Sequence, residues 1–305
     1  MRDRGYWKSH YVVETEAVAI ERNIKLTSFA SQGKNFELVH FHRGKNVPNI
    51  LISPGSGGHS YVFAELAYHV YLKGYNVFIM PKHGGDTIPK LMGRHRDALM
   101  HILENFGERI GVFSEGLGGF VTFYLALDHG PMRSIICQNS PGILTERRFQ
   151  EAVLEGGGAA GRRRASLPLL KVLVRLSPNV KLPISLYLDW KELIDTKDEN
   201  REVETRLVKE GYLRDPDFDR LYPLSAIMSL VLTPPPRPLE ELRVPTMFLV
   251  PLRGWSDPAY VRDLYNRLPP ITKRMVEVDG GVYWMCSHPR AASDLICDWF
   301  DDSLC

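Results

Sequence analysis

The sequence predicts an α/β fold in which a mostly parallel sheet carries helices on both faces. Short apolar runs alternate with helically periodic segments from residue 24 to residue 119, and this is the pattern of repeated strand–helix units. Glycine-rich turns follow several of the apolar runs. The chain has 305 residues, of which 44% are hydrophobic and 24% charged. That length suits one large domain of this class with an insertion.

Each element follows from its own pattern. The first strand pair is predicted at residues 24–29 and 36–41, joined by a glycine-containing turn. Further apolar runs predict strands at residues 49–53, 77–80, 110–113, 134–138, 246–250 and 274–278. Helical periodicity predicts helices at residues 61–72, 94–106 and 290–300.

Residues 144–240 break this alternation. They are mostly helical in pattern, rich in charge, and end in a stiff proline-rich run at residues 233–238. We therefore expect a helical cap at residues 144–240, inserted into a core made of residues 1–143 and 241–305.

The expected cap carries two features that bear on partners. The run Arg162, Arg163 and Arg164 could meet an anionic partner, but a solvated charge run is the simpler interpretation. Aromatic side chains could line an apolar pocket or serve only the packing of the cap. They are Tyr187, Trp190, Tyr212, Phe218 and Tyr222.

Composition excludes several classes of partner. The net charge of +2 gives no reason to expect nucleic acid or a membrane surface. No apolar run is long enough for a membrane span, and the first residues lack the apolar stretch of a secretory signal. The 4 cysteines have no metal-binding spacing, so we expect reduced thiols, a cytoplasmic protein, no metal site and no cofactor.

The most informative segment is residues 109–126, which predicts a buried strand, a tight turn and a helix. Residues 114–119 have the sequence Ser-Glu-Gly-Leu-Gly-Gly, which matches G-x-S-x-G-G, the turn that presents a serine nucleophile. Gly116 stands at the serine position and has no side chain. Making Ser114 the nucleophile instead would place Val112 where a small residue is needed.

Three further segments complete a pattern. Pro54-Gly55-Ser56-Gly57-Gly58-His59 follows a predicted strand, Val244-Pro245-Thr246 begins a strand that leads to Asp257-Pro258, and residues 279–284 precede the final helix. With the turn at residues 114–119, their order and spacing resemble the α/β-hydrolase superfamily, in its lipase and esterase branch with a helical cap. The resemblance runs from about residue 24 to residue 301.

This resemblance implies a role for each position. The backbone N–H groups of Ser56 and Leu117 would form an oxyanion hole, and Asp257 would be the acid of the triad. An Asp that caps a helix is an equally good interpretation of Asp257. Counting back from the proline of the final helix places Val282 where the family has its histidine. His288 could replace it only if the final helix were much shorter.

Three hypotheses for function follow. With Gly116 and Val282 at the nucleophile and base positions, the chain would be a non-hydrolytic member that binds a small apolar or ester-like molecule, or a protein, under the cap. Alternatively, Ser114 or His288 would make it an active esterase, lipase or thioesterase. In the third hypothesis, Glu115 and two loop histidines, His59 and His83, would perform lyase or isomerase chemistry.

The remaining histidines have simpler interpretations. His40 and His42 are two residues apart on a predicted strand, where a metal pair is conceivable, but a solvated edge strand is the expected setting. His95 and His101 fall on a polar helix and are expected at the surface.

Overall fold

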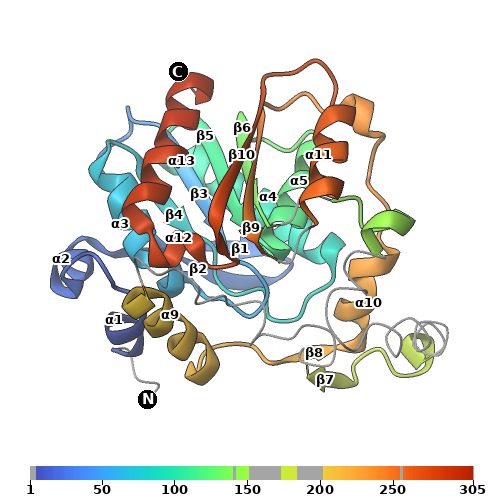
Figure 1. Ribbon diagram of the computed structural model, residues 1–305, viewed down its shortest axis with the longest axis horizontal. Coiled ribbons are helices and arrows are strands. Elements are labelled where there is room, and N and C mark those ends of the chain that lie inside the picture. Colours follow the sequence, from blue (N-terminus) through green and yellow to red (C-terminus); the bar gives the residue numbers. More distant parts are fainter. Residues whose placement is uncertain (1–4, 140–141, 151–172, 184–201, 255–256, 305) are drawn as a thin grey trace.

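A central sheet organises the computed structural model (Figure 1). The structure describes residues 5–139, 142–150, 173–183, 202–254 and 257–304. Within these residues the sheet has 8 strands in the order β1-β2-β4-β3-β5-β6-β9-β10. The predicted α/β class with a mostly parallel sheet is confirmed.

The first two strands are antiparallel, and the rest of the sheet is parallel. β1 (Lys25–Ser31) and β2 (Lys34–Phe41) form a hairpin, and β2 pairs antiparallel with β4 (Asn76–Ile79). From β4 onward every pair is parallel. These strands are β3 (Asn49–Ser53), β5 (Ile110–Glu115), β6 (Ser134–Gln138), β9 (Thr246–Arg253) and β10 (Lys273–Gly281).

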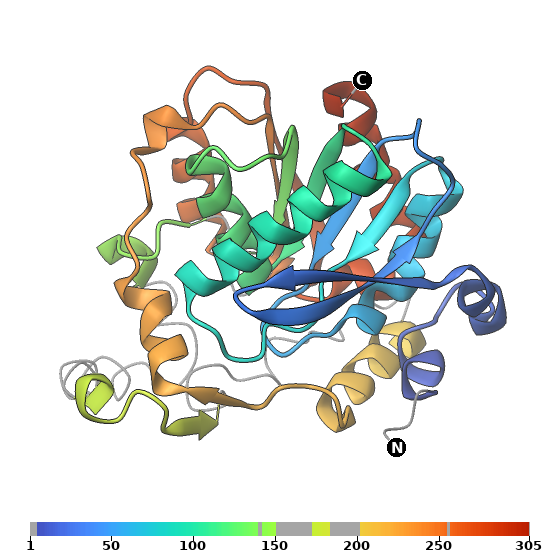
Figure 2. The same ribbon diagram turned by 180° about the vertical axis from the view of Figure 1, so that it is seen from behind.

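Helices cover both faces of the sheet and divide the core in two. One face carries α3 (Ala64–Leu72), α12 (Trp284–Ser287) and α13 (Pro289–Leu304). The other carries α4 (Ile88–Phe106), α5 (Leu117–Leu127) and α11 (Pro258–Arg267), of which α4 and α5 lie in front in Figure 2. Successive strand residues point to opposite faces; thus Ile50 and Ile52 join one core cluster and Leu51 the other.

An N-terminal arm and an insertion lie beyond the carboxyl ends of the parallel strands (Figure 1). The arm contains α1 (Tyr6–His10) and α2 (Ala17–Asn23), and α1 packs on α9 (Glu202–Arg214). The part of the insertion between β6 and β9 that is described also contains β7 (Lys181–Pro183), β8 (Leu221–Pro223) and α10 (Leu224–Leu232). Short 3-10 turns, η1 (Ser60–Phe63) and η3 (Leu239–Glu241), precede α3 and β9.

Two predictions about histidines were wrong. β2 lies between β1 and β4 rather than at an edge, and the His40 ring is buried parallel to Phe78 with centroids 5.2 Å apart. His95 is buried as well, because its face of α4 packs on the sheet. Among the described residues no group of three or more His, Cys, Asp or Glu side chains could hold a metal ion.

Two helices differ from the prediction. α4 begins at Ile88 rather than residue 94, because Pro89 occupies the first turn, where its missing N–H costs nothing. The short helix α12 follows the last strand directly and was not predicted. The cysteines at residues 137, 286 and 297 are buried and unbridged, as expected.

Candidate functional site

The strand-to-helix turn between β5 and α5 has the backbone expected of a nucleophile elbow. Gly116 has φ 51° and ψ −120°, a conformation that strains any residue with a side chain. Its N–H donates to the carbonyl oxygen of Gln138 at 3.1 Å, and its own carbonyl accepts from Gly119 at 3.0 Å. The elbow is therefore tied to β6 and to the first turn of α5.

The position of a Cβ atom on Gly116 has few neighbours. Chain neighbours apart, a Cβ atom there would have only the Cα of Gly55 at 3.3 Å and the backbone nitrogen of Ser56 at 4.0 Å within 4 Å. Gly118, by contrast, has no such room, since a Cβ would lie 2.5 Å from the carbonyl oxygen of Ser53. Small residues thus let α5 start against the end of β3.

Two backbone N–H groups are close to Gly116 in the fold or in the chain. Ser56 lies on the turn after β3, and Leu117 is the first residue of α5, where an N–H has no acceptor inside the helix. None of the hydrogen bonds formed among the described residues engages either N–H. These are the two N–H groups that the resemblance would use as oxyanion donors.

The expected histidine position holds an apolar side chain. Val282 is 3% exposed and packs in the core cluster that contains α13. Its carbonyl oxygen accepts from the side-chain amides of Gln138 at 3.1 Å and Asn139 at 2.7 Å. Because Gly116 bonds to the Gln138 backbone, Val282 lies beside the elbow, but it offers only a carbonyl there.

The expected acid and the two alternative triad members take structural roles. His288 lies on Trp284, with ring centroids 5.5 Å apart, just before α13 begins. Asp257 is an exposed helix cap whose carboxylate accepts from the N–H of Ala259 at 2.9 Å. Ser114 is buried on β5, where its hydroxyl donates to the carbonyl oxygen of Ile136 at 2.9 Å. This geometry supports neither the Ser114 nor the His288 alternative.

Glu115 is buried rather than at the pocket mouth. It is 2% exposed, and its Oε2 atom lies against Gly55 at the position of a missing Cβ. Burial raises the pKa of Glu115 to about 8, although the Gly55 N–H and the Asn139 amide act in the opposite direction. Near neutral pH this carboxyl group therefore keeps its proton.

The loop histidines do not join Glu115. His83 is buried and donates from Nε2 to the carbonyl oxygen of Pro54 at 2.6 Å, and burial lowers its pKa to about 4. His59 instead contacts the insertion, with Nε2 2.8 Å from Asp215 Oδ2. The acid/base group of Glu115, His59 and His83 that the sequence suggested is therefore not assembled.

The insertion contacts the turn after β3 and the turn before α12. The N–H of Asp219 donates to the carbonyl oxygen of Gly57 at 3.2 Å, and the ring of Phe218 contacts the Cα of Gly57. Tyr212 stacks on Tyr283. Tyr212, Phe218 and Tyr222 are buried here, whereas Tyr187, Trp190 and the run of three arginines lie outside the described residues.

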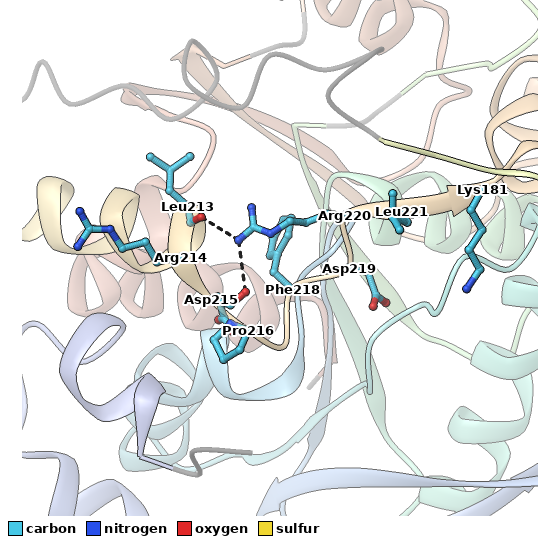
Figure 3. Close-up of a pocket in the computed structure, with 9 residues that line it drawn as sticks. All are labelled: Lys181, Leu213, Arg214, Asp215, Pro216, Phe218, Asp219, Arg220 and Leu221. Carbon is cyan, nitrogen blue, oxygen red and sulfur yellow. Dashed lines mark hydrogen bonds between the residues drawn. The ribbon is translucent and has the colours of Figure 1, made fainter. Parts of the chain in front are cut away.

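A cavity of about 580 Å³ lies on the outer side of the insertion. It opens beside the end of α9, and Figure 3 shows the Arg220 guanidinium turned toward the carbonyl oxygens of Leu213 and Asp215. Its lining residues are Lys181, Leu213, Arg214, Asp215, Pro216, Phe218, Asp219, Arg220 and Leu221.

Sequence reasoning missed the contacts of the N-terminal arm. The Tyr11 hydroxyl donates to Asp215 at 2.6 Å, on the same oxygen that His59 contacts. The Tyr6 hydroxyl donates to the carbonyl oxygen of Gly211 at 2.9 Å. These residues are far apart in the chain and match no motif, so only the folded arrangement reveals them.

Solved structures with a similar fold are numerous. A soluble variant of monoglyceride lipase from Saccharomyces cerevisiae, bound to a substrate analog, aligns over 96% of this chain and 97% of its own, with TM-score 0.69 and 14% identity. A hypothetical protein from Pseudomonas aeruginosa aligns over 98% and 97%, with TM-score 0.70 and 13% identity. The epoxide hydrolase VrEH1 from Vigna radiata covers 92% of this chain and 99% of its own, with TM-score 0.60 and 14% identity.

These likenesses identify the fold. The chain has the α/β-hydrolase fold, as its sequence predicted. No protein-family model matches the sequence, and neither does any curated protein. Across the described part of the chain, none of the helices combines the length and the apolar character that crossing a membrane requires.

Proposed function

We propose that this α/β-hydrolase-fold chain binds a small organic molecule at its elbow without hydrolysing esters. One observation carries the proposal: Gly116 keeps the strained elbow backbone but has no side chain and supplies no nucleophile. An acyl-enzyme needs both a nucleophile and a base to activate it. Val282, at the position that the resemblance assigns to the base, supplies neither.

In this proposal residues 144–240 act as a cap on a core formed by residues 1–143 and 241–305. The contact of Asp219 with Gly57 and the stacking of Tyr212 on Tyr283 support this role, because both bring the insertion onto the turns around Gly116. A ligand held there would be enclosed between the cap and the sheet, in the crevice where α/β proteins commonly bind small molecules.

The test compares the wild-type chain with G116S and with G116S/V282H, using a fluorophosphonate label and 4-nitrophenyl acetate. We expect the wild type and G116S to remain unlabelled. Their release of nitrophenol should exceed the rate in buffer by no more than about 10³–10⁴-fold, which is the residual catalysis of an oxyanion hole without a triad. G116S/V282H places a nucleophile and an imidazole at the two positions that the resemblance assigns to them, and we expect it to gain labelling. Stoichiometric labelling of the wild type would overturn the proposal.

A further inference from the structure

The cavity on the outer side of the insertion is a second place where a small molecule fits. Its volume of about 580 Å³ falls within the range of about 300–1,000 Å³ that is common for small-molecule sites. Its described lining residues come from β7 and from the stretch that runs from the end of α9 into β8. None of them belongs to the elbow or to the turn after β3, so this cavity is separate from the site proposed above.

Three cationic side chains line this cavity without a carboxylate partner. Lys181, Arg214 and Arg220 form no ion pair with any residue that the structure describes. Figure 3 shows the Arg220 side chain between those of Arg214 and Lys181. One wall of the cavity therefore carries a row of positive charges that is available to a bound anion.

The two acidic residues of the lining are already engaged by groups outside it. Asp215 is buried, and its Oδ2 atom accepts from the Tyr11 hydroxyl at 2.6 Å and lies 2.8 Å from His59 Nε2. Asp219 forms an ion pair with Lys82 at 2.9 Å. Tyr11, His59 and Lys82 do not line the cavity. The lining carboxylates are thus held by other partners and do not balance the three cations.

Arg220 is the cation that the fold holds most firmly. Its Nη2 atom donates to the carbonyl oxygens of Tyr212, Leu213 and Asp215 at 3.1, 2.9 and 3.3 Å, and its guanidinium carbon lies 5.5 Å from the centre of the Phe218 ring. Carbonyl groups position the guanidinium but do not cancel its charge. Its Nε and Nη1 atoms form no hydrogen bond with the described residues. A guanidinium fixed in this way loses little freedom when an anion binds.

We propose that this cavity binds a small organic anion, which has a carboxylate or phosphate group on a short apolar body. The free N–H groups of Arg220 donate to the anionic group, and Lys181 and Arg214 flank it with their charges. Hydrogen bonds between such cations and a carboxylate or phosphate are short and about twice as strong as those between neutral groups. This site is additional to the one at the elbow and does not depend on it.

The apolar part of the lining selects an organic anion over an inorganic one. Phe218 is buried, Leu213 is partly buried, and Leu221 is exposed where β8 begins. An inorganic ion would fill a small part of about 580 Å³ and gain nothing from these side chains. A ligand with an apolar body would also remove their surface from water, which favours binding.

The experiment measures binding of 2-naphthoate and of 2-naphthyl phosphate by isothermal titration calorimetry. The neutral probe of matched shape is 2-naphthamide. We expect wild-type protein at about pH 7 to bind at least one of the two anions saturably, and to bind the amide at least about tenfold more weakly. Raising the salt concentration from about 0.05 M to about 0.5 M should weaken binding of the anion but not of the amide, because salt screens exposed charges.

Paired substitutions test the flanking charges. K181Q/R214Q removes both and should weaken binding of the anion about tenfold or more. K181R/R214K keeps both charges, so we expect affinity within about threefold of wild type. The matched control is K34Q/K90Q, which removes two exposed cations that do not line the cavity and should bind as wild type does. Circular dichroism checks that each variant is folded.

Three results would overturn the inference: no saturable binding of either anion by wild type, equal affinity for naphthamide, or folded K181Q/R214Q that binds as wild type does. An equal loss in K34Q/K90Q would also overturn it, because binding would then follow the net charge of the protein rather than this cavity. If K181Q/R214Q does not fold, the comparison with naphthamide and the effect of salt on wild type decide.

Discussion

The ring of Tyr212 lies on the ring of Tyr283, with centroids 3.7 Å apart and planes 24° from parallel. Tyr283 follows Val282, which occupies the position expected for the histidine base. Tyr11 from the N-terminal arm meets the edge of Tyr212, with centroids 5.4 Å apart. One aromatic group thus joins the arm, the insertion and the last turn of the core beside Gly116.

Removing the Tyr212 ring should loosen this junction. We expect Y212A to lower the free energy of unfolding by about 3 kcal/mol or more, since it empties a buried aromatic site. Y212F keeps the stack and removes only the hydroxyl, so its loss should be much smaller. Urea denaturation measures both, and equal losses would contradict the assigned role of the ring.

Asp215 should be more important for stability than its neighbour Asp219. Burial alone would raise the pKa of Asp215, but the hydrogen bond and charge of His59, with the Tyr11 hydroxyl and the Asp217 N–H, lower it overall. D215N replaces a carboxylate oxygen, which accepts hydrogen bonds from these groups, with an amide NH₂ that can only donate. We expect the free energy of unfolding to fall by about 2–4 kcal/mol.

D219N is the matched control for D215N. Asp219 forms a partly exposed ion pair with Lys82 at 2.9 Å, so its loss should cost less than about 1 kcal/mol. Thermal unfolding of both variants at neutral pH checks the difference. A D219N variant as unstable as D215N would contradict the view that the His59 and Tyr11 contacts of Asp215 stabilise the fold.

Adding one methyl group at Gly118 should be strongly destabilising. A Cβ there would meet the Ser53 carbonyl at 2.5 Å and the Pro54 carbonyl at 2.6 Å, and backbone atoms cannot move away cheaply. We expect G118A to lose about 3 kcal/mol or more. G44A is the control, because nothing lies within 4 Å of its Cβ position. Similar unfolding midpoints for the two variants would refute the clash.

Buried neutral histidines should make the protein sensitive to acid. Burial lowers the pKa of His40 to about 4 and that of His95 to about 3. In the unfolded chain both protonate near pH 6.5, so the unfolded state binds more protons below that pH. Stability is thus complete above pH 6.5 and is lost as pH falls toward the folded pKa values.

H40F tests this linkage at one site. The His40 ring already lies parallel to Phe78, so phenylalanine suits the position and cannot take up a proton. The free energy of unfolding should fall less between about pH 7 and pH 5 in H40F than in wild type. The difference between the two falls is the contribution of the one proton that His40 takes up on unfolding. An unchanged difference would mean that His40 is not held neutral.

The sequence by itself determined most of the frame. The apolar run at residues 49–53 matches β3, and the run at residues 134–138 matches β6. Continuous apolar runs and glycine turns are local signals, so a single sequence is enough to find them. The same locality placed Gly116 at the elbow, because the glycines that follow it are required where α5 starts against β3.

Side-chain partners across the fold were decided by tertiary structure alone. Glu115 is adjacent to the elbow in sequence, but its burial depends on Gly55, Tyr212 and Tyr283, which come from three other parts of the chain. His59 looked like a pocket base until Asp215 and Tyr11 became its neighbours. Ionisation and hydrogen bonding depend on such distant contacts, and no local spacing encodes them.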